Sequence, residues 1–124
     1  MTDNQVLIEQ ISKRAEKHLD ESEDDLLERS ATLWVEIDAQ VNQIRPTKKE
    51  IRKFLEKVVN GVVKDVTKTH REITVVTLTF ATTQLVNYLI TTVGWSIVNP
   101  YAIPLELLAV IVYTRLLKEI GKTL

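Results

Sequence analysis

Cysteine is absent from this 124-residue chain, and histidine occurs only twice. Without cysteine there is neither a disulfide nor a thiol nucleophile. The two histidines, His18 and His70, are too far apart in sequence for a His-x-x-x-His metal motif. The N-terminus is polar and carries no apolar signal-peptide region, so we expect the first half to stay in the cytoplasm or an equivalent compartment.

Catalytic patterns are also missing from the sequence. There is no nucleophile–base set, no phosphate-cradling glycine loop and no metal cluster, and glycine and proline number three each. We therefore expect a protein that is not an enzyme and that carries no cofactor or metal. The basic residues are matched by acids within the chain and have no aromatic residues between them, so nucleic acid is not an expected partner.

Charge is distributed unevenly along the chain, although the averages of 44% hydrophobic residues, 27% charged residues and a net charge of −1 look ordinary. Up to Glu72 the sequence holds 15 acidic and 13 basic residues, whereas from Ile73 onward it holds two acids and three bases. We therefore divide the chain into a charged segment, residues 1–72, and an apolar segment, residues 73–124.

The charged segment shows helical periodicity. Residues 3–20 carry one apolar stripe, and a second helix is expected over residues 23–43, starting at Ser22. Apolar residues of the second helix alternate in steps of three and four, as in a coiled coil. The seam is formed by Leu27, Ser30, Trp34, Ile37, Val41 and Ile44. We expect Leu27, Trp34, Ile37 and Val41 to join copies of the chain.

A third helix is expected after Arg45-Pro46, because Thr47 followed by Glu50 forms a capping box. The valine pairs Val58-Val59 and Val62-Val63 also suit a strand, but the apolar period of 3.5 residues in this segment favours a helix. Residues 1–43 have a charge balance of −7 and residues 44–72 one of +5, so the second and third helices should lie antiparallel. The basic helix presents either a solvated face or a face attracted to anionic lipid.

The apolar segment is long enough for two membrane spans. No charged residue occurs from Ile73 to Leu105, whereas about 20 residues cross a bilayer. We expect spans over residues 73–93 and 100–117, with one continuous helix running from near Lys48 into the first. Gln84 and Asn87 would then hold helices together within the membrane. The alternative is a buried helix of a soluble bundle.

The residues around the expected turn support a hairpin. Trp95 and Tyr101 are typical of the membrane interface, and Gly94 and Pro100 interrupt helices. Basic residues flank both outer ends of the hairpin, but none lies in the turn. They are Lys64, Lys68, Arg71, Arg115, Lys118 and Lys122. The positive-inside rule then places both termini on the cytoplasmic or matrix side.

The turn Trp95-Ser96-Ile97-Val98-Asn99-Pro100 is similar to the Trp-Asp-Ile-Met-Glu-Pro signature of the mitochondrial calcium uniporter family. The resemblance implies a coiled coil, two spans and a tetrameric pore lined by the start of the second span. Ser96 and Asn99 stand where the family has its two acids, so the carboxylate rings that select calcium are absent. Thr91-Thr92-Val93-Gly94-Trp95 also resembles the start of the potassium-channel filter, with Ser96 where that filter has glycine.

The expected fold is all-α, with an N-terminal helical hairpin or coiled-coil region leading into a two-helix transmembrane hairpin. The function that this favours is a homo-oligomeric ion pore in a lipid bilayer, passing a small ion and lined by Ser96, Asn99 and Glu106. Its mouth would be packed by Trp95, Pro100 and Tyr101. Two alternatives stay open: a membrane-anchored helical scaffold without transport activity, and a soluble all-helical oligomerisation domain.

Overall fold

The computed structural model describes residues 3–41, 43, 45–69, 75–94 and 101–123. These residues form five α-helices, a 3₁₀ turn and a π-helical turn, and no β-strand occurs among them. The elements are α1 (Asp3–Ala15), η1 (Glu16–His18), α2 (Glu23–Val41), α3 (Lys48–Thr69), α4 (Leu78–Tyr88), η2 (Leu89–Val93) and α5 (Ala102–Thr123). The predicted all-α fold is confirmed.

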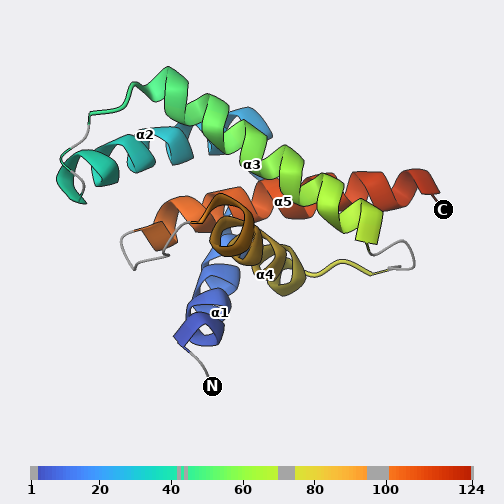
Figure 1. The fold of residues 1–124 in the computed structure, drawn as a ribbon. Coiled ribbons are helices and arrows are strands. Elements are labelled where there is room, and N and C mark those ends of the chain that lie inside the picture. The colour runs from blue at the N-terminus through green and yellow to red at the C-terminus, as the bar shows by residue number, and fades with distance from the viewer. Residues whose placement is uncertain (1–2, 42, 44, 70–74, 95–100, 124) are drawn as a thin grey trace.

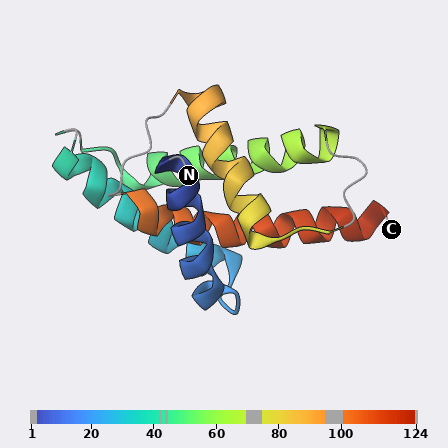
Figure 2. The ribbon, with the colours of Figure 1, turned by 90° about the horizontal axis from the view of Figure 1, so that it is seen from below.

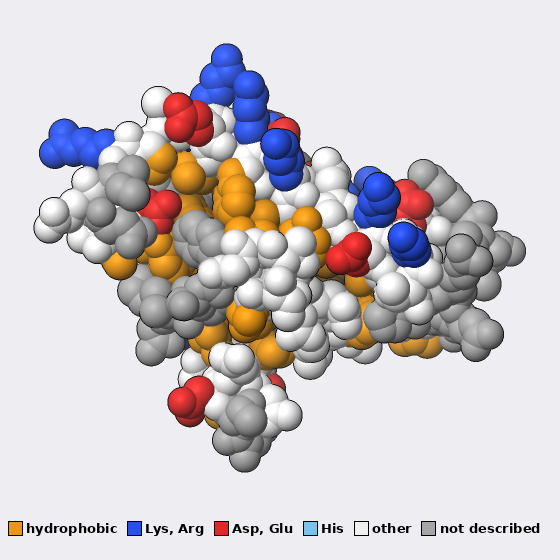
Figure 3. Space-filling model, in the orientation of Figure 1, with side chains coloured by type: hydrophobic (Ala, Val, Ile, Leu, Met, Phe, Trp, Pro, Cys, Tyr) orange, Lys and Arg blue, Asp and Glu red, His pale blue; other side chains and the backbone are white. Residues whose placement is uncertain are grey.

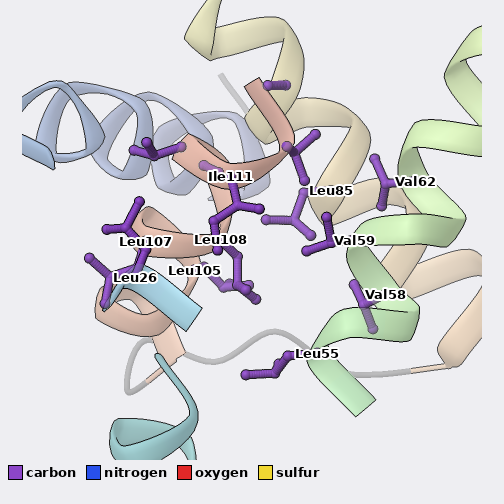
Figure 4. Packing of buried hydrophobic residues seen from close by; sticks show 14 of the residues in the cluster. Leu26, Leu55, Val58, Val59, Val62, Leu85, Leu105, Leu107, Leu108 and Ile111 are labelled. Carbon is purple, nitrogen blue, oxygen red and sulfur yellow. The ribbon is translucent and has the colours of Figure 1, made fainter. Parts of the chain in front are cut away.

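Helix α5 occupies the middle of the molecule and packs against α1, α2, α3 and α4 (Figures 1 and 2). Leu105 to Val112 are each exposed by 6% or less, which means that this stretch is enclosed on every face. Figure 4 shows Leu26 of α2, Val59 of α3 and Leu85 of α4 around it. Apolar side chains of this size contribute about 1.5–3 kcal/mol each when fully buried, so α5 is the centre of the core.

The structure places the apolar segment differently from the predicted membrane hairpin. None of the helices within the described ranges combines the length and the apolar character needed to cross a bilayer. The expected continuous helix from Lys48 to residue 93 is wrong, because α3 ends at Thr69 and residues 75–77 are not helical. Thr77 then starts α4 by accepting a hydrogen bond from the Phe80 amide at 3.0 Å. The predicted spans 73–93 and 100–117 are therefore unsupported in the described residues.

Two predicted helix starts, at Ser22 and Thr47, are confirmed by their caps. Ser22 Oγ accepts from the Asp25 amide at 3.2 Å, and Thr47 Oγ1 accepts from the Glu50 amide at 3.2 Å. Each side-chain oxygen satisfies a backbone N–H that has no partner within its own helix. The residues just before these two helices therefore predict correctly where each helix begins.

Ion pairs join α2 and α3, which confirms the predicted pairing of an acidic with a basic helix. Lys48 Nζ lies 2.7 Å from Glu28 Oε2, Arg52 Nη2 lies 2.6 Å from Asp24 Oδ1, and Arg52 also pairs with Glu28. Both acids lie near the start of α2. In a tight hairpin, the start of α3 would instead lie beside the end of α2. The two helices therefore cross obliquely with a long stagger (Figure 1).

Candidate functional site

The predicted seam of α2 is divided between the core and the surface. Leu27 and Trp34 are 5% and 1% exposed, and the hydroxyl of Ser30 donates to Pro104 O of α5 at 3.1 Å. Ile37 is half-buried, whereas Val41 is 51% exposed. The first part of the predicted oligomer seam is thus used inside the chain. Self-association through Ile37 and Val41 stays a prediction.

Tyr101, predicted at a pore mouth, is a core residue that ties α5 to α2. It is 4% exposed, its hydroxyl donates to a carboxylate oxygen of the buried Asp38, and its ring centroid lies 4.9 Å from that of Trp34. Phe54 of α3 also approaches Trp34 edge-on, with ring centroids 6.3 Å apart. Sequence reasoning missed Asp38 because an acid one turn from Trp34 has no pattern of its own. The other predicted mouth residues, Trp95 and Pro100, lie outside the described residues.

Glu106, a predicted pore-lining residue, is 6% exposed within the enclosed part of α5. Burial raises the pKa of its carboxyl above the usual 4.5, and the positive charges around it, led by His18 and Arg14, oppose that rise. Glu106 therefore lies beside the end of α1 in the folded chain. Ser96 and Asn99, the other predicted pore-lining residues, lie outside the described residues, so the pore stays a prediction.

Gln84 and Asn87, predicted as helix contacts, lie together where α4 meets α3. They line a polar pocket of about 110 Å³ with Asp65, Val62, Tyr88, Thr91 and Thr92. Thr91 and Thr92 belong to the π-helical turn η2, a rare conformation that is frequent at functional sites. Gln84 and Asn87 thus lie where α4 meets α3, and their predicted role as helix contacts within a membrane stays a prediction.

A larger groove of about 500 Å³ opens between the C-terminal halves of α3 and α5 and the first turn of α2. Its lining residues are Glu23, Asn60, Val63, Lys64, Thr67, Arg115, Lys118 and Glu119. Arg115 is fixed at the centre: its Nε donates to Glu23 Oε1 at 2.5 Å, and its Nη1 donates to Asn60 Oδ1. The sequence placed these bases at two ends of a hairpin, and the fold brings them together.

Lysine side chains occupy the outer face of α3. The buried stripe of this helix faces α5 and holds Ile51, Leu55, Val58, Val59, Val62 and Val66. The helical period places five exposed lysines on the opposite side. We call them the lysine row: Lys49, Lys53, Lys57, Lys64 and Lys68. Figure 3 shows basic side chains projecting along the edge that α3 forms.

Carboxylates are sparse beside the lysine row. Glu56 faces Arg52, whose Nε lies 3.4 Å from Glu56 Oε1, and Asp65 lines the polar pocket on the α4 side. Glu50, in the first turn of α3, shares the exposed side with the lysines, and the partly exposed Glu56 and the exposed Asp65 lie at the two edges of that side. Within the described part of the chain, no ion pair of 4 Å or less involves a lysine of the row.

Among the residues that the structure describes, no three His, Cys, Asp or Glu side chains lie close enough together to hold a metal ion. Comparison with known proteins gives no parallel either: no family model, no curated protein and no solved structure matches the chain.

Proposed function

We propose that this chain is a non-enzymatic helical module that associates with an anionic lipid surface through the lysine row of α3. The observation that carries the proposal is the five exposed lysines on one helix face, none of which forms an ion pair of 4 Å or less among the described residues. A surface of this kind attracts phosphate and carboxylate head groups with about 1 kcal/mol per lysine near a negatively charged leaflet.

The rigidity of α3 supports the same conclusion. Its inner face packs on α5 through side chains such as Leu55 and Val62, which are 0% and 1% exposed, so the lysines are held on a fixed surface. Arg52 and Lys48, by contrast, point toward α2 and are neutralised by Asp24 and Glu28. Arg52 and Lys48 thus stabilise the fold, whereas the lysine row remains available to bind a partner.

The charge distribution of the whole chain favours an oriented contact. The net charge is only −1, but the acids are concentrated in residues 1–43 and the bases in residues 44–72. A surface with a negative potential therefore attracts the α3 side and repels the acid-rich side formed by α2. We expect binding to weaken with added salt, because exposed charges are screened within about 10 Å at 0.1 M ionic strength.

The test is flotation of the chain with vesicles. Wild type should bind phosphatidylserine–phosphatidylcholine vesicles and not pure phosphatidylcholine. The double change Lys53→Gln and Lys57→Gln should weaken binding about 30-fold, since two lysines at about 1 kcal/mol each are lost. Both side chains are exposed and unpaired with acids, so the helical content seen by circular dichroism should be unchanged.

A matched control removes the same amount of positive charge from another part of the protein. Lys13→Gln with Lys17→Gln removes two exposed lysines near the end of α1, away from α3. This variant should bind nearly as wild type does. The proposal fails if the two double variants lose the same affinity, because net charge alone would then explain binding. It also fails if wild type ignores anionic vesicles at low salt.

A further inference from the structure

We propose that the groove between α3 and α5 is a binding site for a phosphomonoester group. Cations from two helices meet there: Lys64 comes from α3, whereas Arg115 and Lys118 come from α5. Lys64 is more than 50 residues away from the other two in the chain, and only the packing of α3 on α5 brings them together. Such convergence gives a tetrahedral anion several donors at once.

Arg115 is prepared for this role by its own partners. Glu23 accepts a hydrogen bond from its Nε, and Asn60 accepts one from its Nη1. The planar guanidinium is therefore held in one orientation, and the side chain is 31% exposed. Its Nη2 group makes no hydrogen bond within the described part of the chain and keeps two N–H donors. A guanidinium suits phosphate oxygens because its fork of donors matches them in pairs.

The polar groups of the lining also suit an anion with several oxygens. Lys64, Arg115 and Lys118 outnumber Glu23 and Glu119, so the groove carries one excess positive charge. A phosphomonoester carries about −1.5 to −2 charges near neutral pH and offers three oxygens, so it can contact all three cations. A carboxylate or a phosphodiester, with a single charge, engages fewer of them. We therefore expect a preference for the monoester.

The ligand has two possible sources with the same chemistry: the head group of a phosphatidic acid lipid, or a small phosphorylated molecule. Lys64 also belongs to the lysine row, but the rest of the site comes from α5 and the start of α2. The site therefore does not depend on the proposed lipid association, and variants at Arg115 or Lys118 leave Lys53 and Lys57 unchanged.

The first arm of the test uses glycerol 3-phosphate, the water-soluble equivalent of the phosphatidic acid head group. In an amide NMR titration, we expect shifts to centre on residues 60–67 and 115–119. Lys118→Gln should weaken the affinity about tenfold, as for loss of one charge-assisted contact. The matched control, Lys57→Gln, removes an exposed lysine outside the groove and should bind as wild type does. Arg115→Lys keeps the charge and loses the fork, so it should also bind more weakly.

The second arm compares vesicles that contain phosphatidic acid with vesicles that contain phosphatidylserine at equal surface charge. A preference for phosphatidic acid that disappears in Lys118→Gln assigns the site to the lipid head group. Binding of glycerol 3-phosphate without that preference assigns it to a small phosphorylated molecule. The proposal is overturned if glycerol 3-phosphate causes no localised shifts, or if Lys57→Gln and Lys118→Gln weaken its binding equally.

Discussion

The phenol end of Tyr88 in α4 packs directly against Gly61 of α3, so a side chain at position 61 would have to displace it. A Cβ atom built on Gly61 would lie 2.5 Å from Tyr88 Cζ and closer still to the hydroxyl oxygen. Glycine inside a helix costs about 1 kcal/mol relative to alanine, so this contact has a local cost that the packing of α4 on α3 offsets. It sets the distance between these helices beside the polar pocket.

We predict that Gly61→Ala destabilises the fold by about 1 kcal/mol, because the clash with Tyr88 outweighs the gain in helix propensity. Urea unfolding followed by circular dichroism measures the change. In a Tyr88→Leu background the same substitution should become stabilising, since the obstructing ring is gone. A Gly61→Ala variant more stable than wild type would show that the helices do not approach this closely.

Tyr101 should contribute to stability through its hydrogen bond to Asp38. Removing the hydroxyl in Tyr101→Phe takes a donor away from a carboxylate that is only 8% exposed. We expect a loss of about 1–3 kcal/mol in the free energy of unfolding. Tyr113→Phe, at a half-buried position on α5, serves as the control and should change stability by less. Equal losses in the two variants would contradict a specific role for the Tyr101–Asp38 pair.

Glu106 should make stability depend on pH. Burial raises the pKa of its carboxyl in the folded chain, so the folded state binds this proton more tightly than the unfolded state does. The contribution is therefore present below about 4.5 and is lost as the pH rises through the folded pKa. Glu106→Gln should be more stable than wild type at neutral pH, and the difference should shrink in acid.

Urea unfolding at neutral and at acidic pH measures this difference, with the exposed Glu9→Gln as a control that should show no such trend. If Glu106→Gln is the less stable protein at neutral pH, the carboxylate must be held in its charged form by the cations around it, and the expected sign is wrong.

The two ends of the α2 seam should respond differently to substitution. Trp34 is 1% exposed and contacts both Tyr101 and Phe54, so Trp34→Ala should cost about 3–5 kcal/mol of stability. Val41 is 51% exposed, and Val41→Asp should leave the free energy of unfolding nearly unchanged. If copies join through this end of α2, sedimentation should show wild type as an oligomer and Val41→Asp shifted toward the monomer. An unchanged mass would remove Val41 from any interface.

Local features of the sequence predicted the structure well where the interaction partners are close in the chain. Ser22 and Thr47 cap helices because their hydroxyls reach amides three residues ahead. The apolar stripe of α3 from Ile51 to Val66 follows from its three- and four-residue spacing. Thr77 also caps a helix, but it was placed inside a span because a continuous apolar run obscured its role.

The membrane interpretation shows what periodicity alone leaves open. A long uncharged segment has the same composition whether lipid or protein surrounds it, and only the positions of α1 to α4 around α5 identify the surroundings in this structure. The burial of polar residues also depends on contacts that are distant in the sequence. Asp38 and Ser30 are acceptable in the core because Tyr101 and Pro104, both distant in sequence, bind them.

The sequence by itself determined the helical content, the helix starts at Ser22 and Thr47, and the contrast between an acidic α2 and a basic α3, because these depend on spacing and composition along a few turns. Only the tertiary structure decided that α5 is the centre of the core. It also decided that Arg115 meets Asn60 and lines one groove with Lys64. The physical reason is that burial and charge convergence depend on contacts between residues far apart in the chain, which local patterns do not specify.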